Sequence, residues 1–140
     1  MDFIFGGASV WITNCDIEFT GTGGSITASA RDTDDDTWFL IDSSNIEAAS
    51  GYLTIEENYL GRPWGILARV QYQYCMITDV INPAGWSTLA ADATPLFYEY
   101  ENTGDGSSTA DRLYETVSPG PVDITTVLGT NYADWVVTDF

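Results

Sequence analysis

The sequence predicts an all-β fold with many turns. Five Trp, eight Tyr and six Phe occur among 140 residues, and hydrophobic residues make up 44% of the chain. Lys is absent, whereas Thr and Val and the turn-forming residues Gly, Asp and Ser are frequent. Aromatic and β-branched side chains favour strands, and the turn-forming residues separate one strand from the next. A chain of this length accommodates one domain with its own hydrophobic core.

A weak internal repeat indicates how the strands are arranged. Three β-rich segments begin at Val10, Phe39 and Val70, which are 29 and then 31 residues apart. They cover residues 10–17, 39–46 and 70–77, a fourth candidate covers 96–102, and shorter strand-like pieces lie between them at 25–30, 51–55 and 80–81. Several short strands per repeat, with no helix between them, favour the stacked coils of a parallel β-helix. An antiparallel sandwich is the alternative, but it prefers tight two-residue turns, which are not obvious here.

The repeat makes a specific prediction about the two cysteines. Cys15 and Cys75 fall in the same column of the repeat, two coils apart. Neighbouring strands lie about 4.8 Å apart, so two layers are separated by roughly 9.6 Å. A disulfide requires Cα atoms within about 7 Å. We therefore expect two free thiols that point into the interior, with Ser44 between them.

The tail has a different character from the coils. We expect coils over residues 1–117 and a helical tail over 118–140, within a single domain. Asp123 is placed to cap a short helical turn that Gly129 ends. A second turn is expected to start at Thr130 or Asn131 and to carry three apolar side chains on one side: Tyr132, Trp135 and Val136.

Charge and composition exclude several classes of function. The formal net charge is −17, with four Arg and no His. A surface for nucleic acid needs a basic patch, so nucleic-acid binding is not expected, and neither is binding to an anionic membrane. Without His, mechanisms that need an imidazole base are excluded, and two thiols do not make a four-ligand zinc site. We expect no metal site of this kind.

One acid stands in an unusual place. Asp2 precedes an apolar run in "MDFIFGG", and Arg62 occurs sixty residues later in "YLGRPWG", close to Trp64. A carboxylate beside apolar residues is costly to bury unless a partner holds it. A bidentate arginine would keep such a carboxylate ionised and oriented, as a nucleophile toward an ester carbonyl requires. One alternative is that Asp2 is only a solvated end residue. The other is a structural ion pair beside a core tryptophan.

These strings resemble pectin methylesterases (pectinesterases), most of all those of fungi. The resemblance runs in the same order along essentially the whole chain, through "DFIFG", "ITNCDI", "SITASAR", "YLGRPWG", "ARVQYQYCMITDVINPAGW", "FYEYENTGDGS" and "LGTNYADWV". It implies a right-handed parallel β-helix that hydrolyses the methyl esters of polygalacturonate and releases methanol without a cofactor. It also implies secretion, because pectin lies outside cells; no signal peptide is visible in the sequence.

The resemblance also assigns roles to residues. It implies that Asp2 is the nucleophile, that Arg62 orients it, and that Trp64 and Trp86 bind the sugar. Leu89 stands where the family often carries a further tryptophan, which puts one sugar contact in doubt.

The family's second catalytic carboxyl, an acid/base aspartate in a "QDT"-type motif, lies upstream of the nucleophile. Here only Met1 precedes Asp2. We therefore expect the C-terminal portion of such an enzyme, cut within its coils, with impaired turnover and an exposed first coil that promotes self-association. The alternative is a non-catalytic pectin-binding module or a structural β-helix fragment.

Overall fold

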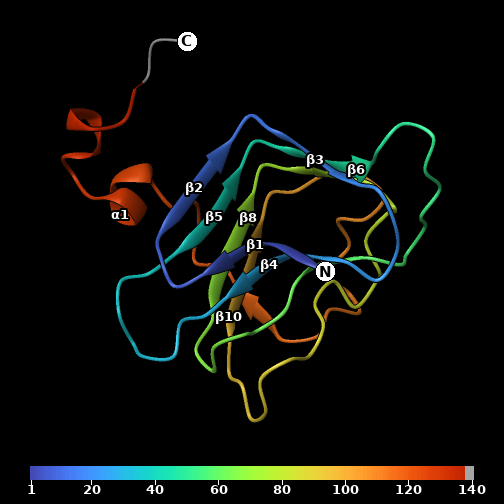
Figure 1. Cartoon of the computed structure of the whole chain (residues 1–140), viewed down its shortest axis with the longest axis horizontal. Helices are drawn as coiled ribbons and strands as arrows, with labels where there is room; N and C mark the ends of the chain where they lie inside the picture. Colours follow the sequence, from blue (N-terminus) through green and yellow to red (C-terminus); the bar gives the residue numbers. More distant parts are fainter. Residues whose placement is uncertain (138–140) are drawn as a thin grey trace.

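The strands stack into the coils of a parallel β-helix. The computed structural model describes residues 1–137, and Figure 1 shows the strands of successive coils lying side by side. One sheet contains β1 (Asp2–Gly6), β4 (Ser25–Ser29) and β7 (Tyr59–Gly61) in that order. The second contains β2 (Val10–Thr13), β5 (Phe39–Asp42), β8 (Arg69–Gln73), β10 (Leu96–Tyr100) and β11 (Glu115–Val117). The third contains β3 (Asp16–Phe19), β6 (Asn45–Ala48) and β9 (Met76–Ile77). All pairings between these strands are parallel, so the predicted fold is confirmed and the sandwich is excluded.

The predicted repeat coincides with the register of the largest sheet. Val10 pairs with Phe39, and Phe39 pairs with Val70, as the alignment of the three segments required. Phe97 in the fourth segment continues the same column by pairing with Val70. The column is apolar because its side chains enter the core, where Phe39, Val70 and Phe97 are buried.

Two of the shorter predicted strands are not present as strands. Residues 51–55 form an exposed loop in which Leu53 is 93% exposed, and β7 takes the corresponding place a few residues later. Ile81 makes only an isolated parallel bridge to Asn58. The β-rich composition of 51–55 was misleading because no strand in residues 1–137 pairs with that segment.

Each coil turns at the same corner without glycine. The corner residues of four successive coils have a left-handed backbone, with φ between 46° and 54°: Asn14, Ser43, Tyr74 and Glu101. Such values are uncommon for residues other than glycine, and asparagine is the best suited of the four. The residue after the corner adds side-chain hydrogen bonds between coils. Ser44 Oγ accepts from the backbone N–H of Cys15 at 3.2 Å, and Asn102 Oδ1 accepts from that of Cys75 at 2.9 Å.

Both cysteines are free, as predicted, but only one of them is interior. Cys75 is buried, whereas Cys15 is exposed. The expectation for Cys15 was wrong because β2 and β3, which flank it, are edge strands of their sheets in the described part of the chain. The Cys15 thiol instead donates to the carbonyl of Thr13 at 3.2 Å.

The two thiols should therefore differ in reactivity. Burial raises the pKa of the Cys75 thiol from 9.0 to about 11, so it stays protonated at neutral pH, and thiolate is the reactive form. We expect a thiol reagent to modify Cys15 rapidly in the native chain and Cys75 only after unfolding. Because the folded pKa is raised, the stability that this thiol contributes is present below pH 9 and declines as pH rises through about 11. Fast labelling of both cysteines at neutral pH would contradict the prediction.

The tail lies across the largest sheet. It carries α1 (Ile124–Leu128), which begins after Asp123, and a 3-10 turn, η1 (Tyr132–Asp134), which begins after Asn131. Asp123 makes no side-chain capping bond, contrary to the prediction, whereas Gly129 ends the helix with φ 91°. Figure 1 shows α1 beside β2, at the outer side of the sheet. The last three residues of the predicted tail lie outside the described residues.

Two buried glutamines hold the tail in place. Gln71 Nε2 donates to the carbonyl of Gly120 at 3.0 Å. Gln73 accepts from the N–H of Val122 at 2.9 Å and donates to its carbonyl at 3.1 Å.

No helix in residues 1–137 is long and apolar enough to cross a membrane.

Candidate active site

Asp2 and Arg62 form a two-pronged ion pair. Arg62 Nε donates to Asp2 Oδ1 at 2.9 Å, and Arg62 Nη2 donates to Asp2 Oδ2 at 2.8 Å. The pair is partly shielded, with the side chains of Arg62 and Asp2 exposed by 34% and 17%. Parallel bonds of this kind fix the orientation of a carboxylate. The hydrogen bond to Asp2 also raises the pKa of Arg62, so the guanidinium stays charged.

The stacking of the coils brings these residues together from sixty positions apart. Asp2 begins β1, and Arg62 directly follows β7, with β4 between the two strands. The N–H of Arg62 donates to the carbonyl of Thr27 in β4 at 3.0 Å, which anchors its backbone to the sheet. The guanidinium then spans the central strand to reach the carboxylate.

The pair lies in an open groove with aromatic walls. A cavity of about 480 Å³ is lined by Met1, Asp2, Phe5, Arg62, Trp64 and Leu89. Trp64 is 51% exposed, and its ring lies 6.0 Å from that of Phe5 at an angle of 55°. Half-exposed aromatic faces are suited to the apolar faces of sugar rings. Leu89, at the position where the resemblance led us to expect a further tryptophan, is itself part of this wall.

Phe5 was missed as a site residue. The sequence presented it as part of the apolar run after Asp2, with nothing to separate a core side chain from one that faces outward. Its position in the groove follows from the pairing of β1 with β4, in which Phe5 lies opposite Ala28.

Trp86 does not line the groove. It is 1% exposed, stacks on Phe97 with ring centroids 4.1 Å apart, and donates from its indole to Glu99 at 3.3 Å. The expected sugar contact for Trp86 is therefore corrected, because no ligand in the groove can touch a side chain that its neighbours enclose. Trp86 instead packs beneath β7, next to Gly61, with which it forms an isolated bridge.

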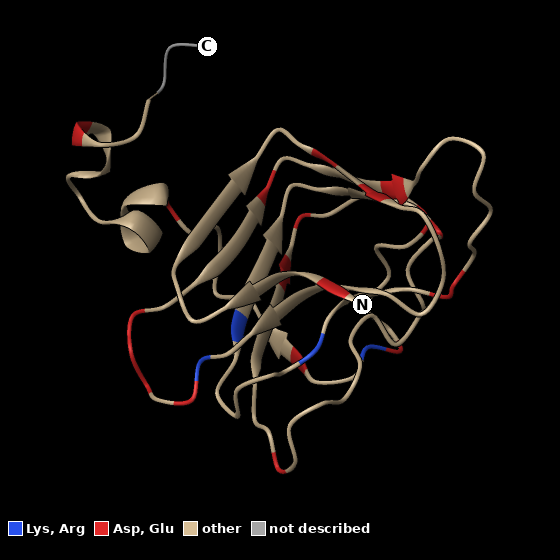
Figure 2. Ribbon diagram, in the orientation of Figure 1, with Lys and Arg blue, Asp and Glu red and all other residues tan. Residues whose placement is uncertain are grey.

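The remaining arginines are held in the framework. Figure 2 shows acidic residues distributed around the molecule and few basic ones. Arg31 pairs with Asp34 and Asp35, and Arg112 pairs with Glu99. The guanidinium of Arg69 lies 4.2 Å from the ring centroid of Trp38 and donates to the carbonyl of Thr37. Among these four arginines, Arg62 is the one whose partner carboxylate lies in a groove.

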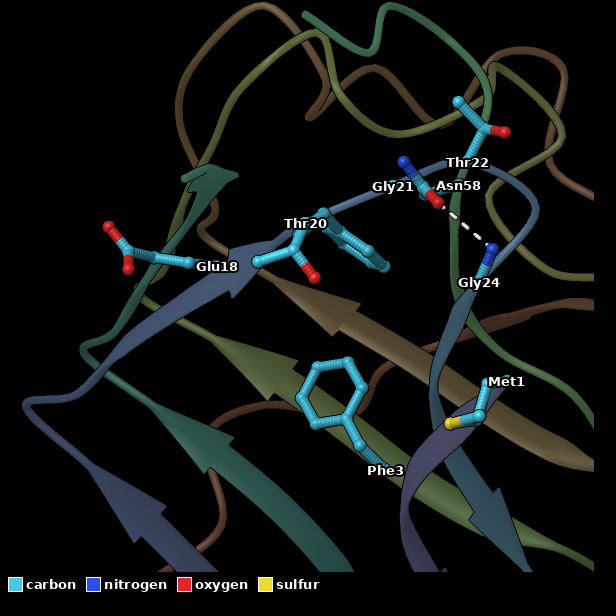
Figure 3. Close-up of a pocket in the computed structure, with 9 residues that line it drawn as sticks. Met1, Phe3, Glu18, Thr20, Gly21, Thr22, Gly24 and Asn58 are labelled. Atoms are coloured by element: carbon cyan, nitrogen blue, oxygen red, sulfur yellow. Dashed lines mark hydrogen bonds between the residues drawn. The ribbon is translucent and has the colours of Figure 1, made fainter. Parts of the chain in front are cut away.

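A second hollow lies at the open end of the core. It has a volume of about 340 Å³ and is lined by Met1, Phe3, Glu18, Phe19, Thr20, Gly21, Thr22, Gly24 and Asn58. Figure 3 shows Phe3 in this pocket, and the N–H of Gly24 donating to Asn58 Oδ1 at 2.9 Å. The rings of Phe3 and Phe19 meet edge to face at 6.0 Å. The hollow is mainly apolar.

Within residues 1–137, no group of three or more His, Cys, Asp or Glu side chains is arranged to hold a metal ion.

Comparison with known proteins decides the family. Residues 1–118 match the sequence profile described as Pectinesterase. The chain belongs to the pectinesterase family. It is 56% identical over 137 residues to probable pectinesterase A of Aspergillus niger and 53% identical over the same length to that of Aspergillus oryzae. Each alignment covers 97% of this chain and 42% of the relative, so the chain spans less than half the length of these pectinesterases.

Solved structures of pectin methylesterases share the fold. The enzyme from Aspergillus niger matches with a TM-score of 0.95 at 55% identity, over 99% of this chain and 46% of that one. The enzyme from carrot matches with a TM-score of 0.77 at 31% identity, over 96% and 47%. The predicted family and parallel β-helix are therefore confirmed for this pectinesterase-family chain.

Proposed function

We propose that this chain carries the nucleophilic half of a site that hydrolyses the methyl esters of polygalacturonate. The observation that supports this most directly is the Asp2–Arg62 pair, in which both carboxylate oxygens are held within a groove that carries half-exposed aromatic rings. Membership of the pectinesterase family points to the same chemistry.

In the proposed reaction, a carboxylate oxygen of Asp2 attacks the carbonyl carbon of the ester. The C=O bond opens to a tetrahedral oxyanion, which collapses as the bond to the methoxy group breaks. The product is an anhydride between Asp2 and the sugar acid, and methoxide leaves as methanol by taking a proton from a general acid. Water then cleaves the anhydride and restores the carboxylate. Arg62 holds the nucleophile in its orientation through two parallel hydrogen bonds.

The charge of the chain favours an esterified substrate over its product. Each hydrolysed ester becomes a carboxylate, and the chain carries a net charge of −17. A methylated segment is neutral and can place sugar rings on Trp64 and Phe5, whereas a de-esterified segment is repelled. We propose methylesterified homogalacturonan as the partner. Since that polymer lies outside cells, we also propose a secreted location.

The chain alone is proposed to turn over methyl esters slowly. Among the described residues that line the groove, Asp2 is the sole carboxylate, so no second carboxyl there can protonate the departing methoxide. General acid catalysis commonly contributes about 10²–10⁴-fold. A leaving group that needs no proton should therefore escape much of this penalty.

Two esters of the same sugar test the proposal. Release of methanol from methylated oligogalacturonate is compared with release of nitrophenolate from a p-nitrophenyl galacturonate ester, each relative to its uncatalysed hydrolysis. We expect a clear enhancement for the aryl ester and a much smaller one for the methyl ester. Binding of the methylated oligomer with no enhancement of either reaction would instead establish a non-catalytic pectin-binding module. Absence of both binding and turnover would contradict the proposal.

Arg62→Lys tests the two-pronged contact. A lysine ammonium cannot donate two parallel bonds in a fixed plane, so Asp2 should lose its orientation. We expect hydrolysis of the aryl ester to fall by about 10- to 100-fold. The free energy of unfolding should change by less than about 1 kcal/mol, because the pair is partly exposed. Aryl ester hydrolysis at the original rate would show that the geometry of the pair is unimportant.

We also propose that the isolated chain self-associates. In residues 1–137, β1, β2 and β3 have one unpaired edge each, and Phe3 lies half-exposed beside the hollow between β1 and β3. Unpaired edges and apolar rings favour pairing with a second copy. Light scattering should give a mass above 15.3 kDa, and more so at high salt, which screens the net charge. Phe3→Lys should shift the chain toward monomer. A monomer at every concentration and salt would contradict the proposal.

A further inference from the structure

A main-chain carbonyl just before Arg62 is held by two buried hydroxyl groups. The carbonyl of Leu60 accepts from Tyr72 Oη at 2.6 Å and from Thr27 Oγ1 at 3.0 Å. Tyr72 and Thr27 are both fully buried. This carbonyl therefore faces the core, and it meets side chains from β8 and β4 there.

Backbone hydrogen bonds to the neighbouring coils fix the chain on either side of this carbonyl. The N–H of Leu60 donates to the carbonyl of Gly85 at 2.7 Å, and the N–H of Ser87 donates to the carbonyl of Gly61 at 3.0 Å. The N–H of Arg62 donates to the carbonyl of Thr27 at 3.0 Å. The chain around the peptide between Leu60 and Gly61 is therefore held on three sides. It bonds to β4 of the preceding coil, to the backbone of the following coil at Gly85 and Ser87, and to two hydroxyl groups in the core.

The backbone of Gly61 packs closely against the side chains of Thr27 and Trp86. A Cβ atom at Gly61 would lie 2.1 Å from Thr27 Oγ1 and 3.2 Å from the ring of Trp86. Only glycine allows β7 to approach the threonine hydroxyl and the indole this closely. Trp86, Tyr72 and Thr27 therefore form a packed wall directly behind the residue that precedes Arg62. The rings of Tyr72 and Trp86 meet at 5.8 Å.

We propose that Thr27 and Tyr72 are positioning residues that set the direction in which Arg62 leaves β7, and so place its guanidinium on Asp2. The proposal rests on the proposed function for its catalytic meaning. Leu60 is two residues before Arg62, so a rotation of the Leu60 carbonyl changes the path of the chain into Arg62. The guanidinium reaches across β4 to make both of its bonds, so a change in the path of the chain moves it relative to the Asp2 carboxylate.

The chemistry of the core supports this role. A buried hydroxyl is unfavourable unless it is hydrogen-bonded, and a core position beside β7 needs only an apolar ring for packing. Tyr72 and Thr27 instead bring two hydroxyls to one carbonyl, within two residues of the guanidinium. Sites that need a fixed geometry depend on this kind of supporting contact.

Nuclear magnetic resonance of Arg62 tests the proposal independently of turnover. The Nε–H group of Arg62, held by Asp2, should give a distinct, slowly exchanging signal, which Asp2→Asn identifies. We expect Tyr72→Phe and Thr27→Val each to shift this signal and to speed its exchange, and the double variant to do so most. Thr27→Ser keeps the hydroxyl and should restore the signal. Where turnover is measurable, kcat for the aryl ester should fall about tenfold with little change in KM.

A matched control separates positioning from general stability. Thr78 Oγ1 donates to the carbonyl of Ile46 at 3.0 Å, which is the same kind of bond between coils in a different sheet. Thr78→Val should lower the melting temperature and leave the Arg62 signal unchanged. An unchanged Arg62 signal in both Tyr72→Phe and Thr27→Val would overturn the proposal, whatever their melting temperatures. If the double variant does not fold, the two single variants decide.

The outcomes also separate this proposal from the proposed function. A shifted and faster-exchanging Arg62 signal in the variants, together with a wild-type chain that hydrolyses neither ester, would confirm the positioning of Arg62 and reject the esterase. Ester hydrolysis by the wild-type chain, with no effect of either variant on Arg62, would do the reverse.

Discussion

Replacing Asp2 by asparagine is expected to lower hydrolysis of the p-nitrophenyl galacturonate ester by at least about 1,000-fold. The amide has nearly the shape of the carboxylate but is not a nucleophile, so no acyl-enzyme forms. The aryl ester is the right substrate for this test, because its leaving group departs without a proton and reports on attack by Asp2 alone. Binding of methylated oligogalacturonate should change much less, because Trp64 and Phe5 remain.

Asp16→Asn is the matched control for this variant. Asp16 is an exposed acid in β3 whose Oδ1 accepts from Asn45 Nδ2 at 2.8 Å, and it lies outside the groove. The substitution makes the same change in charge and should leave hydrolysis of the aryl ester intact. Equal activity of Asp2→Asn and Asp16→Asn would remove Asp2 from the mechanism.

Replacing Arg112 by leucine is expected to lower the free energy of unfolding by about 3–5 kcal/mol. Arg112 and Glu99 form an ion pair with bonds of 2.9 Å, and their side chains are only 1% and 6% exposed. The leucine variant leaves the Glu99 carboxylate buried and without its cation. It also removes the bond from Arg112 to the carbonyl of Gly106 at 2.7 Å. Urea unfolding monitored by tryptophan fluorescence gives the difference.

Two further variants test the reason for that loss. Arg112→Leu combined with Glu99→Leu should recover part of the stability, since no buried charge is left unpaired. Asp34→Asn removes one of the two carboxylates that pair with Arg31. The Asp34 side chain is 93% exposed, so this change should cost less than about 1 kcal/mol. A loss of less than about 1 kcal/mol in Arg112→Leu would mean that water reaches Glu99 in the native chain.

Much of the framework was predictable, because the repeat records which residues stack on one another. Residues that share a column face the same side of the sheet, and Phe39 and Val70 both face the core, so the spacing of such residues gives the register directly. The pairing of Asp2 with Arg62 was a hypothesis for a related reason, since an acid beside an apolar run is costly to bury without a partner and the sequence contains few cations; the family resemblance favoured it. Both inferences depend on a cost that burial imposes on single residues.

The errors have a common physical origin. Trp86 and Trp64 are both tryptophans next to glycine, and only the path of the chain buries one and exposes the other. The role of the Leu60 carbonyl is a property of the backbone, which no side-chain pattern reveals. Tyr72 appeared only as another β-forming residue, although its hydroxyl meets a peptide twelve positions away. Contacts of this kind depend on how the coils close, which composition and spacing do not determine.

The left-handed corner in each coil has a consequence for how members of this family can diverge. The corner residues Asn14, Ser43, Tyr74 and Glu101 are separated by 29, 31 and 27 positions, yet they share one backbone conformation. Differences in coil length are therefore absorbed elsewhere, in the loops that connect the other sheets. Insertions in those loops can reshape the rim of the groove, while the spacing between layers, and with it the distance from Arg62 to Asp2, stays constant.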